Sequence, residues 1–434
     1  MIRALLALVL LVFAGCAHAP ESPASSTKPT APAPKTHLDW RREAAAARQR
    51  HDYPAFLAAT ESALKLRPDS PTYLYNLACA YALNGRPRDA LDALRRLCAL
   101  GVVLPLEQDA DLASVRLLPG FKEIRVAMHH NAQPHGKVAP LFDLPNRTGI
   151  VEGIAYLPAT DDYLLADVHE RCVWRSLRDG TLTRFSAPDP GLLGVFKLQL
   201  DEAHGLLWAS TSALPEISGY TPELKGQGAL VAFDLKTGKI VKKFPLPTDG
   251  RNHCIGDFLL APDGTFYLPD SIAPVIWRLR PGADHLEKFV ESREFSSLQG
   301  AGLMAHNTKL VVTDYTNGIF VVDLATQKIS AVTPPAHATL LGIDQFLAKG
   351  DTLLAVQNGV EPQRVVRVTL SSNLEKATRL EILASGQPGF DDLAHFTLVD
   401  GWLMIVGHSG WSDFDQGKGA PPPHTIRVMT INAP

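Results

Sequence analysis

The sequence predicts an all-β six-bladed propeller over residues 150–434, preceded by a small α-helical domain over residues 37–128. The first observation is a recurring unit: an apolar strand, a polar turn, a second apolar strand and a polar or acidic stop. This unit first occurs as VEGIAYLPATDDYLLAD from Val151 and then returns five times. Returns spaced by roughly 40 to 50 residues, with several short strands in each, are typical of propeller blades. The five returns begin at Gly194, Ile255, Gln299, Gly342 and Phe390.

The second observation concerns the two ends of the propeller sequence. A strand-like run, Val138–Leu144, lies in the segment 129–149, which we interpret as a linker and closing strand. The C-terminal run HTIRVMTIN, from His424, supplies another strand. If both runs enter one blade, the ring closes and its sheet edges are removed. We therefore expect the sixth blade to be built from both ends.

Residues 37–128 show a helical pattern with an internal period of 34 residues, so that Phe56 is matched by Ala90 and Pro68 by Val102. Repeats of this length are typical of paired antiparallel helices. The unit YLYNLACAYALNGRPRDALDALRRL, from Tyr73, resembles the tetratricopeptide repeat family. The resemblance implies a spacer or a surface that docks a protein partner. Capture of a peptide is the alternative.

Residues 1–16 have the pattern of a signal peptide, with one arginine followed by the apolar run ALLALVLLVFA. This run is too short to span a bilayer. It ends in FAGC, and Cys16 resembles the lipidated cysteine of bacterial lipoproteins. That resemblance implies export and a lipid anchor on Cys16, and Ala17 favours the outer membrane, facing the periplasm. An ordinary signal peptide, cut elsewhere, is the alternative. Residues 17–36 are expected to form a disordered tether.

Composition excludes several classes of function. The chain has 434 residues and a net charge of -3, which gives no electrostatic case for nucleic-acid binding. A serine elbow, a Walker loop and a zinc-type cysteine pattern are all missing from the sequence. The cysteines that follow Cys16 lie in apolar settings and are expected to be buried free thiols. These are Cys79, Cys98, Cys172 and Cys254.

Polar residues at the start of each innermost strand are the candidates for a functional site. These strand ends converge on one face of a propeller channel. Four of the six starts carry a carboxylate on an otherwise apolar segment. Oxygen atoms arriving from several strands are what calcium or magnesium requires. The six positions are Glu152, Lys197, Asp257, Gln299, Asp344 and the pair Asp391-Asp392.

From Glu152 to about Trp411, the chain resembles the senescence marker protein (regucalcin) and gluconolactonase family in its motifs and blade rhythm. The resemblance rests on Glu152-Gly153, on APDGTFYLPDS from Ala261 and on Asp344. It implies a divalent metal, expected to be calcium, held by Glu152, Gln299 and Asp344. It also implies that Asp344 is the catalytic general base of lactone hydrolysis.

The chain departs from this family at three positions, one of which is Gln345, where the family has a glycine after the aspartate. Gln299 stands where the family has an asparagine, and Gly256 stands where the family has a substrate-facing asparagine. A less characterised bacterial branch resembles the chain in the run LLAVQNGVEPQRVVRV of the fifth blade and in the Phe-Asp pair that opens the sixth. Asn358 and Asp391 would be features of that branch. The candidates for substrate contact are therefore Asp257, His253, Asn358 and Asp391.

Two functions of different classes remain open. One is hydrolysis of a lactone or related ester, in which a metal polarises the carbonyl and a carboxylate or histidine activates water. The other is a non-catalytic lipoprotein, whose propeller binds a small ligand and whose helical repeats dock a protein partner. Asp167, Asp270 and Asp314 are expected to accept hydrogen bonds in turns. His395 and His408 are expected to make hydrogen bonds between blades.

Overall fold

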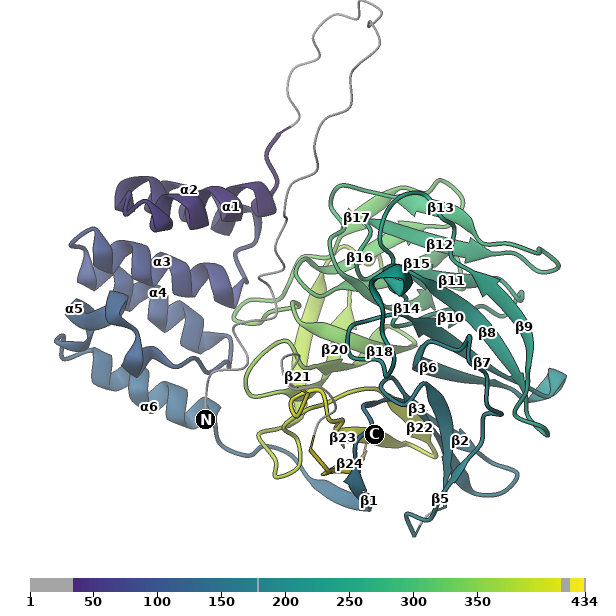
Figure 1. Cartoon of the computed structure of the whole chain (residues 1–434). Coiled ribbons are helices and arrows are strands. Elements are labelled where there is room, and N and C mark those ends of the chain that lie inside the picture. Colours follow the sequence, from purple (N-terminus) through teal and green to yellow (C-terminus); the bar gives the residue numbers. More distant parts are fainter. Residues whose placement is uncertain (1–33, 178, 415–421, 433–434) are drawn as a thin grey trace, which may run out of the picture.

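The computed structural model describes residues 34–177, 179–414 and 422–432. In this part of the chain a stack of helices lies beside a propeller of six four-stranded sheets (Figure 1), which confirms the predicted fold class. The predicted signal peptide, Cys16 and most of the tether lie outside the described residues. None of the described helices is long and apolar enough to cross a membrane.

The first four helices repeat with the period seen in the sequence. Helices α1 and α3 begin at His37 and Pro71, and α2 and α4 begin at Tyr53 and Pro87, so both pairs of starts are 34 residues apart. The resemblance to tetratricopeptide repeats stays a prediction. The helices are α1 (His37–Gln49), α2 (Tyr53–Leu66), α3 (Pro71–Leu83), α4 (Pro87–Ala99), α5 (Ala113–Arg116) and α6 (Phe121–Asn131).

Local sequence accounts for where these helices begin and how they pack. The side chains of Thr36, Asp52 and Ser70 each accept a hydrogen bond from a backbone N–H of the first turn of α1, α2 and α3. Such caps satisfy donors that have no partner within the helix. Ala78 and Ala90 are fully buried. Small side chains at these positions let α3 and α4 approach closely.

Each blade is an antiparallel sheet of four strands. The first blade consists of β2 (Val151–Leu157), β3 (Asp162–Asp167), β4 (Cys172–Ser176) and β5 (Leu182–Arg184). The second consists of β6 (Gly194–Asp201), β7 (Leu206–Ser212), β8 (Gly228–Asp234) and β9 (Ile240–Pro245). The third consists of β10 (Leu259–Leu260), β11 (Phe266–Pro269), β12 (Val275–Leu279) and β13 (Glu287–Glu291). The fourth blade consists of β14 (Leu298–Met304), β15 (Lys309–Asp314), β16 (Gly318–Asp323) and β17 (Ile329–Ala331). The fifth consists of β18 (Ile343–Lys349), β19 (Thr352–Gln357), β20 (Arg364–Leu370) and β21 (Ala377–Ser385).

The sixth blade joins the two ends of the propeller sequence. Its strands, from the axis outward, are β22 (Phe396–Val399), β23 (Trp402–His408), β24 (His424–Asn432) and β1 (Val138–Arg147). Strand β1 pairs with β24, with Phe142 opposite Val428. The expected closure of the ring by both ends is therefore confirmed, and β1 extends beyond the predicted Leu144. Closure leaves each blade flanked by two others.

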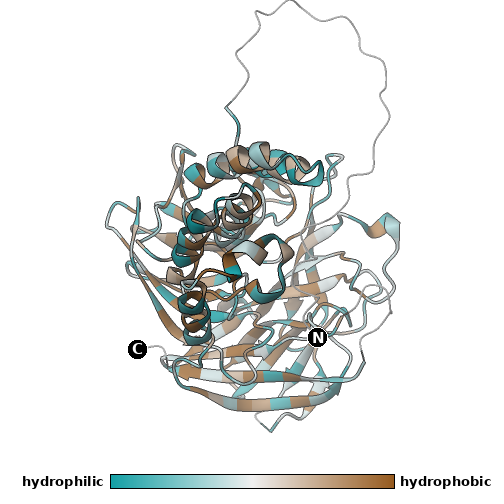
Figure 2. Ribbon diagram, turned by 90° about the vertical axis from the view of Figure 1, so that its left-hand side faces the viewer, coloured by the Kyte–Doolittle hydropathy of each residue, from teal (hydrophilic) through white to brown (hydrophobic). Residues whose placement is uncertain are grey.

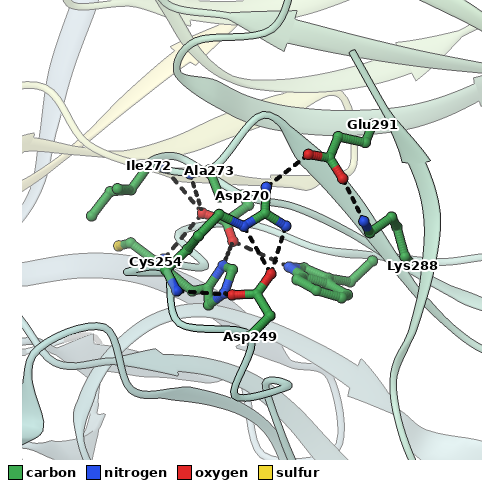
Figure 3. A network of polar contacts seen from close by, with 10 residues as sticks. Asp249, Cys254, Asp270, Ile272, Ala273, Lys288 and Glu291 are labelled. Atoms are coloured by element: carbon green, nitrogen blue, oxygen red, sulfur yellow. Dashed lines mark hydrogen bonds and ion pairs between the residues drawn. The ribbon is translucent and has the colours of Figure 1, made fainter. Parts of the chain in front are cut away.

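Buried aspartates fasten the second strands of three blades, as expected. Asp167, Asp270 and Asp314 stand at or just after the ends of β3, β11 and β15, and each accepts several backbone N–H groups. Figure 3 shows Asp270 receiving the amides of Cys254, Ile272 and Ala273. These contacts satisfy amides of the connecting turns that no strand partner reaches.

The helical stack packs against blades four and five. The guanidinium of Arg67 lies 5.9 Å from the centre of the Phe320 ring. Val360, from the loop between β19 and β20, belongs to the hydrophobic core of the helices. Figure 2, viewed from the helical side, shows the helices stacked one above another in front of the propeller. The two parts therefore share a buried interface.

We predict that Phe142→Ala destabilises the protein by about 3–5 kcal/mol, because it removes a buried ring. Phe142 lies on β1 and is 5.6 Å, between ring centres, from Tyr163 of blade one. The free energy of unfolding in urea would measure the effect. Val241→Ala, on the exposed outer strand β9, is the matched control and should cost far less. Equal losses in the two variants would contradict a special role for the closing strand.

Candidate metal centre in the central channel

One polar residue from each blade stands at the start of its innermost strand. Four of these residues lie in β-bulges, because the pairing with the second strand shifts between Val151 and Gly153, Val195 and Leu198, Leu298 and Ala301, and Ile343 and Phe346. A bulge re-aims the side chain of the extra residue. The six residues are Glu152, Lys197, Asp257, Gln299, Asp344 and His395.

A glycine next to the first of these residues allows the strands to approach. A Cβ atom on Gly153 would lie 2.1 Å from the backbone oxygen of Phe196 on the neighbouring blade. No other residue fits such a close backbone contact. The Glu152-Gly153 pair of the sequence thus has two roles: the glutamate faces the channel and the glycine brings blades one and two together.

Three of the ring residues form a buried cluster. Single ligand atoms of Glu152, Asp344 and His395 all lie within 4.8 Å of one another. The Nε2 atom of His395 is 3.7 Å from Oε1 of Glu152, which is too long for a hydrogen bond. Nδ1 of the same ring is buried and has no hydrogen-bond partner among the described residues. The cluster therefore contains a buried imidazole whose nitrogens are not satisfied.

Neighbouring side chains hold the two carboxylates in place. Asn358 donates from Nδ2 to Oδ2 of Asp344 (2.9 Å) and to the backbone oxygen of Leu393 (2.9 Å), and its Oδ1 accepts from the hydroxyl of Tyr315 (3.0 Å). The indole N–H of Trp411 donates to Oε2 of Glu152. These contacts come from three different blades, so the position of each carboxylate depends on the closed ring.

The charges of the channel are not balanced. Burial raises the pKa of Glu152 well above its usual range, and the nearby charge of Asp344 raises it further. Burial likewise raises the pKa of Asp344. Burial, with the charge of Lys197, lowers the pKa of His395 to about 3, so the imidazole is neutral. Lys197 is already paired with Asp257. Two carboxylates therefore remain without a cation, which is the charge that a divalent ion neutralises.

The structure brings some of the predicted site residues together and separates others. Glu152, Asp344 and Asn358 share one site. Gln299, predicted as the third metal ligand, lies within hydrogen-bond distance of the hydroxyls of Ser271 (3.4 Å) and Ser297 (3.2 Å), and its role as a ligand stays a prediction. Among the described residues, no hydrogen bond joins Gln299 to Glu152 or Asp344. Asp257 bonds Lys197, and its Oδ2 has no partner in the described part of the chain.

The start of the sixth blade lies later than the sequence indicated. We placed it at Asp391-Asp392, whereas β22 begins at Phe396, so His395 occupies the channel position. Asp391 is largely exposed and accepts a hydrogen bond from His408 (3.0 Å). His408 also contacts Asp413 (2.8 Å), in the loop that follows its own strand, so among the described residues neither ring nitrogen bonds a strand of another blade, contrary to expectation. The apolar pattern of this segment does not show where β22 begins, so no local signal singled out His395.

His253, a predicted substrate contact, belongs to a separate polar network, of which Figure 3 labels Asp249 and Asp270. The Nδ1 atom of His253 lies 2.7 Å from Oδ2 of Asp270, and its Nε2 lies 2.9 Å from Oδ1 of Asp249. Asp249 also accepts from Arg251, which reaches Glu291. With both ring nitrogens bonded to carboxylates, His253 fastens the loop before β10 to the end of β11.

Comparison with solved structures gives remote similarities. No protein-family model matches the chain, and no curated protein matches it. The PQQ-bound aldose sugar dehydrogenase of Streptomyces coelicolor is 13% identical, with 69% of this chain and 100% of that chain covered and a TM-score of 0.44. A luciferin-regenerating enzyme is 14% identical (68% and 95% covered, TM-score 0.44). A gluconolactonase from Xanthomonas campestris is also 14% identical (68% and 89% covered, TM-score 0.44).

We predict that the contribution of His253 to stability depends on pH. Its hydrogen bond to Asp270, with that to Asp249, raises its pKa above the usual 6.5. The stabilisation is therefore complete below pH 6.5 and is lost as the pH rises through the higher folded-state pKa. Urea unfolding should show that His253→Gln costs on the order of 1–3 kcal/mol at pH 6. The cost should be smaller at pH 9.

The control for this prediction is His285→Gln. His285 contacts only the exposed Asp284, and its own side chain is 79% exposed. Its loss should change the free energy of unfolding little at either pH. A cost of His253→Gln that is the same at pH 6 and pH 9 would contradict the assigned charge state.

Proposed function

We propose that the chain is a metal-dependent hydrolase that acts on a lactone or related ester in the propeller channel. The observation that carries the proposal is the buried cluster of Glu152, Asp344 and His395. Its two carboxylates lack a cation, and its imidazole lacks a hydrogen-bond partner among the described residues. Burial of such groups is costly unless a ligand compensates them. A divalent ion would neutralise both carboxylates and accept the lone pair of one imidazole nitrogen.

The donor set suggests which ion fits. Two carboxylate oxygens suit calcium, which the sequence resemblance implies, but calcium takes six to eight oxygen ligands. A neutral imidazole nitrogen suits manganese, cobalt or zinc better. His395 therefore favours a transition-metal ion over calcium. Gln299, the third ligand implied by the resemblance, is replaced in this proposal by His395.

The residues of the chain have distinct parts in the proposed reaction. Asn358 holds Asp344, and Trp411 holds Glu152, so both carboxylates keep one orientation. A bound divalent ion would supply Lewis acidity toward a carbonyl oxygen and would lower the pKa of water. Asp344 takes the proton of the attacking water, in the role that the resemblance implies, and its raised pKa suits that role. Asp257 offers the unbonded Oδ2 as an acceptor for a substrate hydroxyl.

Metal binding gives the direct test. After removal of metals with a chelator, the wild-type protein should gain thermal stability with Mn²⁺ or Zn²⁺, by about 2.7 kcal/mol at a metal concentration 100 times Kd. The double variant Glu152→Gln, Asp344→Asn should lose the effect, and His395→Gln should weaken it. Asp391→Asn is the matched carboxylate control, because Asp391 bonds only His408 at the surface.

Two outcomes would contradict the proposal. One is the absence of any metal-dependent shift in the wild-type protein, which would leave the propeller as a binding platform for a ligand or protein partner. The other is an undiminished shift in the double variant, which would place the ion elsewhere. If Gln299→Ala abolishes binding and His395→Gln does not, the ligand set of the family resemblance holds instead.

We further propose that the protein acts at the surface of a membrane, anchored by a lipid on Cys16 and facing the periplasm. The support is the signal-like run and the FAGC sequence that ends it. A single Cys16→Ser change should move the protein from the membrane fraction to the soluble fraction, because the lipid supplies the buried methylenes. Cys98→Ser is the control, since Cys98 is a buried free thiol. An unchanged membrane fraction for Cys16→Ser would contradict the anchor.

A further inference from the structure

The loop between β19 and β20 connects the channel to the helices. It begins at Asn358, which bonds Asp344 in the candidate site. Two residues later, Val360 is buried in the hydrophobic core of the helical stack. The backbone oxygen of Glu361 then accepts a hydrogen bond from the amide of Val103 (2.6 Å). Within a few residues, the chain thus passes from the metal centre into the helical domain.

Arg364, at the end of this loop, fastens the helices to blade five. Its side chain is 1% exposed, and Nη1 donates to the backbone oxygens of Leu100 (3.4 Å) and Gly101 (3.2 Å), just beyond the end of α4. Carbonyl groups at a helix C-terminus lack partners and attract positive charge. Burial lowers the pKa of Arg364 to about 10, so the guanidinium is charged at neutral pH. A cation of the propeller thus caps a helix of the other domain.

The same arginine supports the strand that carries Asn358. Its Nε donates to Oε1 of Gln357 (2.7 Å), the residue before Asn358. Gln357 in turn donates to the backbone oxygens of Thr339 (2.9 Å) and Leu341 (2.6 Å). Residues 339–342 form the segment that leads into β18 and Asp344. One buried chain of hydrogen bonds therefore links α4 to both segments of blade five that enter the site.

Asp69, in the turn between α2 and α3, holds the second of these segments directly. Its Oδ2 accepts from the amide of Leu340 (3.2 Å) and lies 3.4 Å from the hydroxyl of Thr339. There is little space for the segments to move, because a Cβ on Gly359 would lie 2.5 Å from Cα of Gly342. The helical domain therefore forms hydrogen bonds with residues 339–340, before Asp344, and with Arg364, after Asn358.

We propose that Arg364 and Asp69 are positioning residues for the channel site, so that the helical domain sets the geometry of Asp344 and Asn358. This inference rests on the proposed metal-dependent function. It gives the helices a second role: besides docking any protein partner, they position residues of the channel site. A change at α4 or at the α2–α3 turn therefore changes metal affinity in the channel, although neither element touches the metal ligands.

The test measures Mn²⁺ affinity by titration calorimetry on the full-length protein, with three variants. Arg364→Met should weaken Mn²⁺ binding at least tenfold, and Arg364→Lys should restore part of the affinity, because it keeps the charge near the α4 carbonyls. Asp69→Asn should weaken binding by a smaller factor. The control is Arg367→Met, three residues along β20, whose side chain faces Glu381 within blade five. Its affinity should stay within twofold of the wild type.

A second readout does not depend on metal. In metal-free protein, Arg364→Met and Asp69→Asn should raise hydrogen exchange of the amides in 339–346 and 357–364, but not in 151–157 of blade one. If Arg364→Met does not fold, as judged by circular dichroism, Asp69→Asn decides the question. Unchanged exchange, or wild-type affinity in folded variants, would overturn the inference. Absence of Mn²⁺ binding in the wild type would instead refute the proposed function, while exchange still decides whether these residues position the two segments.

Discussion

Two buried carboxylates without a neighbouring cation are the constraint on which the rest of the channel depends. Glu152 and Asp344 come from blades one and five, and burial raises the pKa of both. Removing charged groups from water costs several kcal/mol each in proteins, so such a pair persists only if the surrounding structure holds it or a ligand neutralises it. The neutral imidazole of His395 beside them adds a lone pair and no charge. Burying these three groups together is costly without a ligand, and this is the strongest physical argument for a site.

The backbone of the propeller, as well as its side chains, positions the two carboxylates. Bulges at the starts of four innermost strands re-aim single residues toward the axis, while the strands beyond them remain apolar and regular. Gly153 then lets blades one and two approach where a Cβ would collide. Because Asn358 of blade five also bonds the backbone of Leu393 before β22, and Trp411 of blade six bonds Glu152 of blade one, ring closure by β1 and β24 is a condition for the site. Stability of the ring and geometry of the centre are therefore coupled.

The helical domain enters the same set of contacts. Arg364 is fully buried between the C-terminal end of α4 and blade five, and its partners belong to both parts. An arginine that is taken out of water needs several acceptors; here backbone carbonyls and Gln357 accept from Nη1 and Nε, while Nη2 has no partner among the described residues. The two domains consequently behave as one hydrogen-bonded body around blade five. This explains why a short helical array, which has few repeats to stack, is stable beside the propeller.

The sequence by itself determined the six blades, the closure of the ring, the turn aspartates and the position of Glu152 and Asp344 at the starts of innermost strands. All of these follow from local patterns: alternating apolar residues, turn residues at fixed offsets, and polar residues at the starts of strands. Only the tertiary structure decided that His395 stands beside the two carboxylates, because a slip of four residues in the start of the sixth blade cannot be detected from its apolar pattern. Only the tertiary structure brought Trp411 to Glu152, 259 residues away, and Arg364 to Leu100, 264 residues away. Contacts over such separations arise from the closure and packing of whole domains, and no local signal in the chain encodes them.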